Sequence, residues 1–156
     1  MTASETPADP DATADASAGG EATELPHPVP EWEADVLLKD GRVAQIRPIV
    51  PEDAPKYVEF YSRVSAESKY FRFFAPYPNL SEKDVTRFTT VDYHARVAFV
   101  VTQQDEIIAV GRYDAITDSE VEVAFLVEDA HQGRGIGQLL LEHLAQAGVH
   151  AIEGVL

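Results

Sequence analysis

Three alternating glycines in the segment QGRGIG, residues 132–137, form the pattern in this sequence that is best suited to chemistry. Gly133, Gly135 and Gly137 leave few Cβ atoms in the way, so backbone N–H groups can converge on an anion where a helix begins. Arg134 adds a positive charge in a chain that is otherwise acidic. The segment therefore predicts a cradle for a pyrophosphate group.

Two common phosphate-binding loops do not fit this segment. A P-loop ends in Gly-Lys-Ser/Thr, whereas Gly135 is followed by Ile136 and Gly137. The dinucleotide-binding pattern GxGxxG also fails, because Gln138 and Leu140 occupy the positions of its third glycine. A flexible strand-to-helix turn without a ligand is the alternative that the glycine spacing leaves open.

The elements on either side of the glycines give them the setting that anion binding requires. Residues 121–127 read as an apolar strand that leads into the loop. The residues that follow at the spacing of an amphipathic helix are Ile136, Leu139, Leu140, Leu144 and Ala147. We expect residues 149–156 to begin another strand, which would make this unit a βαβ crossover.

The sequence before this unit predicts two hairpins separated by helices. The expected elements are a hairpin over residues 36–48, a helix over 51–64, a short helix or turn over 65–78, a helix that starts at Ser81, and strands at 96–102 and 107–114. Asp40 and Gly41 suit a two-residue type I′ turn in the first hairpin. Ser81 with Asp84 three residues later is typical of a capped helix start.

The order of the elements predicts an α+β fold with a mixed, largely antiparallel sheet flanked by helices. Residues 32–156 supply this domain. Residues 1–31 are an acidic, Ala- and Pro-rich segment of low complexity, which we expect to be disordered. Because the chain stops on the apolar pair Val155-Leu156, we expect the natural protein to continue and the fold to be truncated at its C-terminus.

Composition argues against several classes of protein. The chain holds 27 acidic and 12 basic residues, for a net charge of −15, so we expect no nucleic-acid partner. It has no cysteine, which excludes disulfides and a thiolate nucleophile, and its histidines do not show zinc-site spacing, so we expect no metal. No apolar run approaches the roughly 20 residues of a membrane span, and no signal peptide is evident, so we expect a cytoplasmic protein without a membrane partner.

The strand, the segment QGRGIG and the helical segment LLLEHL together resemble the acetyl-CoA-binding signature of the GNAT superfamily of N-acetyltransferases. That signature, Q/R-x-x-G-x-G/A, maps to Gln132, Gly135 and Gly137, and the resemblance covers about residues 36–156. The stretches SAESKYFRFF, TTVDYHARVAFVV and VEVAFLVEDAHQGRGIG resemble bacterial protein lysine acetyltransferases, in which a GNAT domain is joined to a region like an NDP-forming acyl-CoA synthetase. The resemblance implies a GNAT-like fold, acetyl-CoA as co-substrate, and an AMP-forming acyl-CoA synthetase as the protein partner whose lysine is acetylated.

The resemblance also assigns roles to particular residues. Glu122 is implied as the general base, acting through water on an amine whose unperturbed pKa is about 10.4. It shares a strand face with Ala124 and Leu126, and a solvated glutamate is the alternative, because Glu120 lies on that face too. The residues implied to hold acetyl-CoA are Leu126, Val127, Gln132, Gly133, Arg134, Gly135, Ile136, Gly137 and Gln138.

The acceptor side is marked by fewer residues. Arg72 and Phe73 are expected to line the acceptor groove, with core packing as the alternative, and Asp92 is expected to help seat a lysine. A general acid is not found here; GNAT enzymes commonly supply a tyrosine from beyond the strand expected near His150. Two other functions remain open, a GNAT enzyme that acetylates a small amine and a domain that senses acyl-CoA without catalysis.

Overall fold

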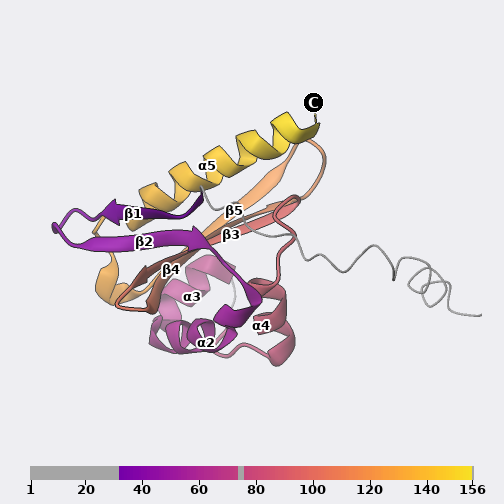
Figure 1. Ribbon diagram of the computed structural model, residues 1–156. Coiled ribbons are helices and arrows are strands. Elements are labelled where there is room, and N and C mark those ends of the chain that lie inside the picture. Colours follow the sequence, from indigo (N-terminus) through magenta and orange to yellow (C-terminus); the bar gives the residue numbers. More distant parts are fainter. Residues whose placement is uncertain (1–31, 74–75, 156) are drawn as a thin grey trace, which may run out of the picture.

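The computed structural model describes residues 32–73 and 76–155 of the protein (Figure 1). The expected disordered segment, residues 1–31, lies outside this range. The strands are β1 (Ala34–Leu37), β2 (Val43–Pro48), β3 (Arg96–Gln103), β4 (Glu106–Ala115) and β5 (Val121–Val127). The helices are η2 (Pro51–Asp53), α2 (Ala54–Arg63), α3 (Ala66–Phe73), α4 (Glu82–Thr89), η3 (Asp129–His131) and α5 (Ile136–Val155).

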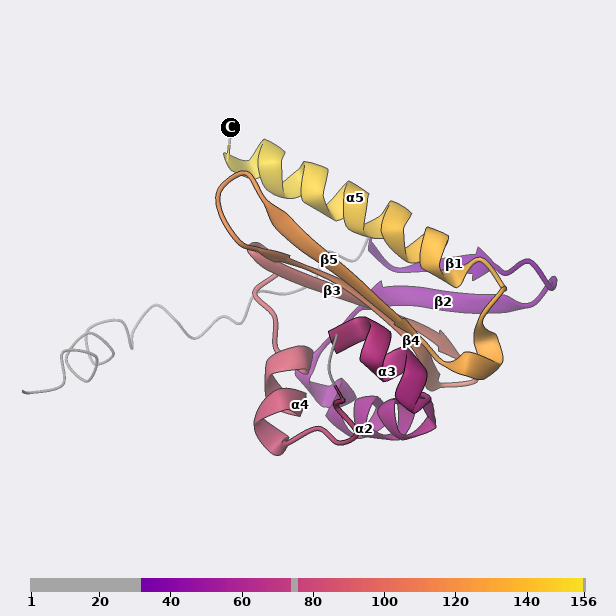
Figure 2. The ribbon, with the colours of Figure 1, turned by 180° about the vertical axis from the view of Figure 1, so that it is seen from behind.

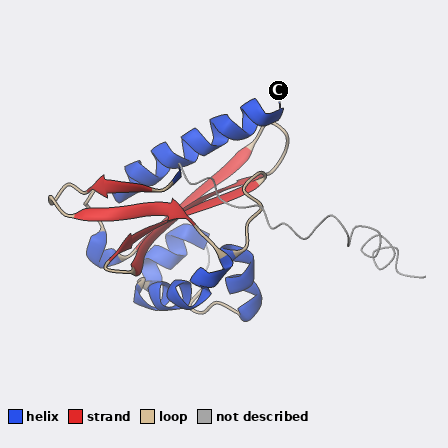
Figure 3. Ribbon diagram, viewed as in Figure 1, coloured by secondary structure: helices blue, strands red, loops and turns tan. Residues whose placement is uncertain are grey.

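The five strands form one sheet in the order β1-β2-β3-β4-β5, and every neighbouring pair is antiparallel. Helix α5 lies along one face of the sheet, and α2, α3 and α4 cover the other face (Figures 1 and 2). The alternation of sheet and helix layers is plain when the elements are coloured by type (Figure 3). The predicted α+β class, with a largely antiparallel sheet between helices, is confirmed.

Strands β3 and β4 are buried on both faces because helices cover them on both sides. Their segments AFVV and IIAVG are accordingly apolar without alternation. Strand β5 alternates instead. Phe125 and Val127 pack toward α5, whereas Leu126 packs toward α2, so the predicted facing of this strand is confirmed.

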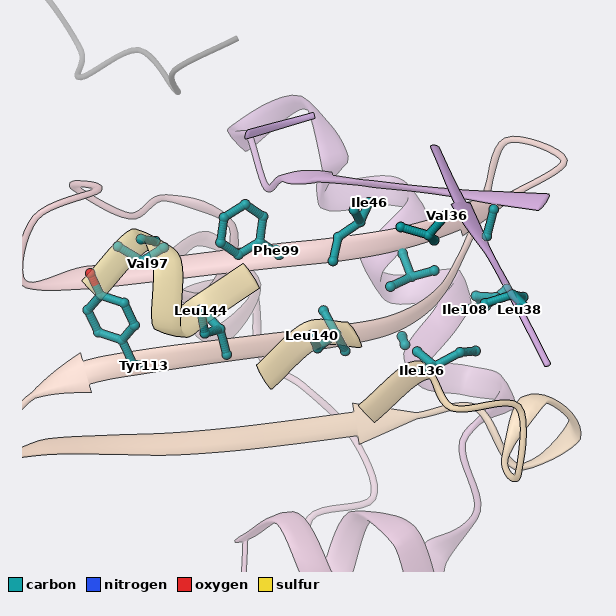
Figure 4. Packing of buried hydrophobic residues seen from close by; sticks show 14 residues of the cluster. Val36, Leu38, Ile46, Val97, Phe99, Ile108, Tyr113, Ile136, Leu140 and Leu144 are labelled. Atoms are coloured by element: carbon teal, nitrogen blue, oxygen red, sulfur yellow. The ribbon is translucent and has the colours of Figure 1, made fainter. Parts of the chain in front are cut away.

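Helix α5 packs through the apolar stripe that its sequence predicts. Ile136, Leu140 and Leu144 are buried between the helix and strands β3 and β4 (Figure 4). The helix approaches β4 closely at Gly111, where a Cβ atom would lie 3.1 Å from the Cβ of Leu140 and from Cδ1 of Phe125. This close approach fixes the start of α5, and therefore the glycine segment before it, at the end of β5.

The first hairpin corrects one predicted turn. Gly41 has φ +85° and its N–H donates to the carbonyl of Leu38 at 2.9 Å, but Asp40 does not have positive φ. The turn therefore contains one left-handed residue and is not the expected two-residue type I′ turn. Gln104 and Asp105, with φ +52° and +65°, form such a turn between β3 and β4 instead.

The C-terminal part of the chain corrects a second expectation. Residues 149–155 continue helix α5 and do not begin a strand, and Leu156 lies outside the described residues. The helical spacing of Leu140, Leu144 and Ala147 extends in the sequence to Ala151 and Val155. A helix satisfies its backbone hydrogen bonds within its own segment, whereas a strand needs a neighbour. The expected βαβ crossover is therefore absent from the described part of the chain.

Candidate active site

The glycine loop, residues 132–137, joins η3 to α5 and leaves a row of backbone N–H groups unused. Gly133 and Gly135 both have φ +80°, which residues with side chains rarely adopt. The first backbone N–H to bond within the helix is that of Leu139, which donates to the carbonyl of Gly135 at 3.2 Å. Within the described residues, no hydrogen bond engages the N–H groups of residues 133–138. Such a row at the start of a long helix favours an anion, as the sequence predicts.

The side chains of the glycine loop mostly hold the loop in place. Ile136 is buried in the core below the helix, and the amide of Gln138 donates along the helix to Glu142 at 3.3 Å. Ile136 and Gln138 can therefore meet an anion through their N–H groups. A Cβ atom on Gly133 or Gly137 would meet nothing within 4 Å, so open space adjoins the loop at both positions.

Arg134, which the sequence predicts to add positive charge to the loop, has that charge paired. Its Nε lies 2.7 Å from Oδ2 of Asp40 in the β1–β2 turn, and its Nη1 donates to Gln103 at 3.2 Å. Its Nη1 also lies 2.6 Å from Nδ1 of His131. The pKa of Asp40 is lowered, chiefly by the backbone N–H of Arg42 and, against the opposing effect of desolvation, also by Arg134. Arg134 therefore fastens the loop to the sheet.

The register of β5 decides which of its backbone groups are free. Glu128 N–H donates to Ile108 C=O at 2.9 Å, so alternate residues from there, including Leu126, bond to β4. The N–H and C=O groups of Phe125 and Val127 consequently point to the other edge, which no strand of the described sheet covers. The backbone contacts to acetyl-CoA that the resemblance implies are therefore available at Phe125 and Val127. At Leu126 only the side chain is available.

A cavity of about 390 Å³ lies between α3 and the end of β5. It is lined by Glu67, Ser68, Arg72, Phe125, Leu126, Val127, Asp129 and Gln132. Four of the residues that the sequence predicts for the site therefore meet in one place, namely Arg72, Leu126, Val127 and Gln132. The cavity adjoins both the glycine loop and the free edge of β5.

Helix α3, which forms one wall of this cavity, is held by residues that sequence analysis missed. The carboxylate of Asp129 accepts hydrogen bonds from Ser65 N–H at 2.9 Å, Ser65 Oγ at 2.8 Å and Ser68 Oγ at 3.2 Å. These bonds, the one from the Ser65 backbone foremost, lower the pKa of Asp129. Gln132 adds a bridge, because its Nε2 donates to Ser68 Oγ at 3.2 Å and to Val127 C=O at 3.4 Å.

A second pair missed by sequence analysis lies beneath the loop. Glu128 is buried, and its Oε1 lies 3.1 Å from Nε of Arg63 at the end of α2. Arg63 also donates to the carbonyl of Ile107 at 2.8 Å. This pair ties the end of α2 to Glu128, which follows β5, and to the start of β4.

Glu122, the predicted base, is exposed at the start of β5 on the face that α2, α3 and α4 cover elsewhere. Its register partner is Asp114, whose Oδ1 lies 3.0 Å from Nε of Arg96. Within the described residues, the side chain of Glu122 makes no hydrogen bond or ion pair, whereas its backbone bonds to β4. Its carboxylate is therefore available to solvent and to a bound molecule.

The predicted acceptor residues separate into different roles. Arg72 lines the cavity, with its guanidinium 4.6 Å from the ring centre of Phe73. Phe73 packs against Tyr77, at 4.7 Å between ring centres, and so belongs to the helical layer. Asp92 accepts from the N–H groups of His94 and Arg96 at 2.9 and 2.8 Å, which holds the turn before β3. Burial raises the pKa of Asp92, but these N–H groups outweigh it and the net shift is downward.

Comparison with known proteins agrees with this geometry. Residues 60–155 match the profile of the Acetyltransferase (GNAT) family, and the chain belongs to that family. The crystal structure of the GNAT domain of S. lividans PAT is 51% identical, covers 80% of this chain and 76% of that one, and superposes with a TM-score of 0.78.

Two further relatives are more distant. The acetyltransferase PA5475 of Pseudomonas aeruginosa is 33% identical over 112 residues, and the chain spans 60% of the length of that relative. RimL, a ribosomal L7/L12 alpha-N-protein acetyltransferase in complex with coenzyme A, is 14% identical, with a TM-score of 0.52 over 66% of this chain and 62% of that one. At that identity the likeness to RimL shows the fold alone.

Two features are absent from the described residues. No helix among them is long and apolar enough to cross a membrane. No group of three or more histidine, aspartate or glutamate side chains among them is placed to hold a metal ion.

Proposed function

We propose that this protein transfers an acetyl group from acetyl-CoA to the side-chain amine of a lysine in a protein. One arrangement carries the proposal: Glu122, the free edge of β5 and the unbonded N–H groups of residues 133–138 follow one another along a single strand-loop-helix unit. Acetyl-CoA is the donor that the GNAT family uses. The transfer needs an anion site and an extended groove for the donor and a base for the acceptor amine, in that order, and this unit provides them.

The glycine loop is suited to the pyrophosphate of acetyl-CoA. The N–H groups of residues 133–138 make no hydrogen bond within the described residues and lie at the positive end of the α5 dipole, where a pyrophosphate is favoured. The pantetheine arm contains amides, which suit the N–H groups of Phe125 and Val127 and the C=O group of Phe125 at the open edge of β5. The C=O group of Val127 accepts from Gln132 Nε2 at 3.4 Å. An arm that leaves the loop along β5 therefore brings the thioester toward Glu122.

The chemistry follows from the same geometry. Three residues, or roughly 10 Å of strand, separate Glu122 from Phe125, so a proton passes from the lysine ammonium through water to the Glu122 carboxylate. The neutral nitrogen attacks the thioester carbonyl carbon, and the N–H groups at the β5 edge stabilise the oxyanion. The C–S bond then breaks, coenzyme A leaves as the thiolate, and the nitrogen gives up its second proton to that thiolate or to water as the neutral amide forms.

A protein acceptor is supported by similarity, and the charge of the site supports a cationic amine of either kind. The chain is 51% identical to the GNAT domain of S. lividans PAT over most of its length. Three carboxylates, those of Asp114, Glu120 and Glu122, lie at the end of the β4–β5 hairpin, and within the described residues only Asp114 is in an ion pair. Their field attracts a lysine ammonium. We propose an AMP-forming acyl-CoA synthetase as the acceptor because of the sequence resemblance.

The test is the intact mass of such a synthetase after incubation with acetyl-CoA and the purified protein. Wild type, Glu122→Gln and the control Glu59→Gln, an exposed glutamate on α2, are compared. One added acetyl group with wild type and Glu59→Gln, but not with Glu122→Gln, is expected. If the wild type binds acetyl-CoA yet adds no mass, a protein acceptor of this class is excluded. Acetylation of a polyamine would then indicate a small-amine enzyme, and binding without any turnover would indicate a sensor.

A further inference from the structure

A lysine from the β1–β2 turn lies directly on the glycine loop. A Cβ atom built on Gly135 would lie 3.1 Å from Cε of Lys39 and 3.4 Å from its Cγ, so the lysine stem crosses Gly135. The backbone holds this contact, because Lys39 N–H donates to the carbonyl of Arg134 at 3.2 Å. The ammonium group is one bond beyond Cε and therefore lies beside the loop.

The charge of Lys39 is unpaired, in contrast to that of Arg134. Lys39 is exposed, and its side chain makes no hydrogen bond or ion pair within the described residues. The Arg134 side chain is only 12% exposed and is held by Asp40 at 2.7 Å. Of these two cations at the glycine loop, Lys39 is the one whose charge is available to a ligand.

A ligand at this loop needs such a charge. Coenzyme A carries a pyrophosphate and a 3′-phosphate, whereas the backbone N–H groups of residues 133–138 supply only partial charges. The protein has a net charge of −15, so its overall field opposes a phosphate ligand. A lysine ammonium acts as a compact, mobile point charge that follows phosphate oxygens without fixed geometry.

We propose that Lys39, whose stem lies across Gly135, binds a phosphate group of coenzyme A. The inference rests on the proposed function, because it takes coenzyme A as the ligand. The sequence predicts that Arg134 supplies the positive charge for the phosphate groups. The inference gives this role to Lys39 in the β1–β2 turn instead. Asp40 in the same turn keeps Arg134 occupied, so the turn positions both cations.

The test is the dissociation constant of coenzyme A, measured by calorimetry on the whole protein. Lys39→Met keeps the apolar stem and removes the charge, Lys39→Arg restores the charge, and Lys83→Met is the matched control on exposed α4. We expect Lys39→Met to bind roughly tenfold more weakly, which corresponds to about 1.4 kcal/mol. Lys39→Arg should stay within about threefold of wild type, and Lys83→Met should be unchanged.

Two further measurements vary the ionic strength and replace coenzyme A with 3′-dephospho-coenzyme A. The loss in Lys39→Met should shrink as ionic strength rises from about 0.05 to 0.5 M, because the Debye length falls below the reach of the ammonium group. If Lys39 contacts the 3′-phosphate, the variant loses affinity for coenzyme A but not for 3′-dephospho-coenzyme A. If it contacts the pyrophosphate, both ligands lose the same factor. Either result supports the proposal.

Equal affinity of Lys39→Met and wild type for coenzyme A would overturn the inference and leave the proposed function intact. A loss that does not change with salt would overturn it too, because packing on Gly135 would then be the cause. If the wild type does not bind coenzyme A, the proposed function itself fails. Thermal unfolding of each variant shows whether it is folded, and Lys39→Gln serves as a second neutral substitution.

Discussion

Removal of the Asp129 carboxylate should loosen α3 from the end of β5. Asp129 accepts three hydrogen bonds at 2.8 to 3.2 Å from Ser65 and Ser68, the residues at the start of α3. Loss of a capping side chain typically costs about 1 kcal/mol. The carboxylate is exposed, so water replaces part of each lost bond and larger values are not expected. For Asp129→Ala we therefore expect a free energy of unfolding lower by about 1 kcal/mol and a Tm lower by roughly 4 °C.

The effect of pH distinguishes loss of the Asp129 hydrogen bonds from a general loss of folding stability. The pKa of Asp129 is lower in the folded protein than its value of about 3.9 in an unfolded chain. The ionised carboxylate thus stabilises the fold above about pH 4, and this contribution is lost as the pH falls through the folded-state pKa. The difference between wild type and Asp129→Ala should be constant from pH 7 to pH 5 and should shrink below pH 4.

Thermal unfolding across this pH range and steady-state kinetics at pH 7 measure the two consequences. Helix α3 forms one wall of the cavity. If the loss of about 1 kcal/mol weakens binding in this cavity, the KM of the substrate bound there would rise by about fivefold. Asp35→Ala, an exposed aspartate on β1 whose side chain has no partner in the described residues, is the control. The reasoning would be refuted if the deficit of Asp129→Ala were the same at pH 3.5 as at pH 7, or if it matched that of Asp35→Ala.

Two substitutions at glycines test how the loop and helix are placed. Gly135→Ala forces a residue with a side chain into the left-handed conformation and places its Cβ atom against Lys39. The affinity for coenzyme A, measured by titration calorimetry, should therefore fall at least tenfold. The Tm should change by only a few degrees. Gly111→Ala places a Cβ atom 3.1 Å from Leu140 and Phe125, so it should lower the free energy of unfolding by about 1–3 kcal/mol in urea titration; an unchanged midpoint would contradict the packing described for α5.

The parts of the fold that depend on residues close together in the sequence were predictable from it. Ser81 and Asp84 cap α4 as predicted, since Ser81 Oγ accepts from Asp84 N–H at 3.1 Å and Asp84 accepts from Ser81 N–H at 3.0 Å. The strand over residues 121–127 and the side to which Leu126 points follow from period-two alternation. These features depend on the spacing of residues that are close together in the chain, and this spacing can be seen in a single sequence.

The support of the site was not predictable, because its partners are distant in sequence. Asp129 bonds to Ser65, and Arg134 pairs with Asp40, yet no periodicity or motif connects the members of either pair. The sequence showed Arg134 as a cation within the glycine loop but not that a carboxylate occupies it. The contact of Lys39 with Gly135 depends in the same way on how the β1–β2 turn packs.

The remaining corrections have a common physical cause. Asp40-Gly41 is compatible with more than one turn type, and the observed turn leaves only Gly41 left-handed. The apolar residues after Gly148 suit either a strand or a helix, and the helix continues through residue 155. In both places the local sequence permits two conformations, and the surrounding structure selects one.

The central claim is that Glu122 takes the proton from the acceptor amine while the glycine loop holds the donor. The most direct measurement is a comparison of kcat/KM for lysine acetylation with the dissociation constant of acetyl-CoA in wild type and Glu122→Gln. Loss of a general base predicts a fall in kcat/KM of about 10²-fold or more with an unchanged dissociation constant. A variant that acetylates the acceptor at the wild-type rate would contradict the account.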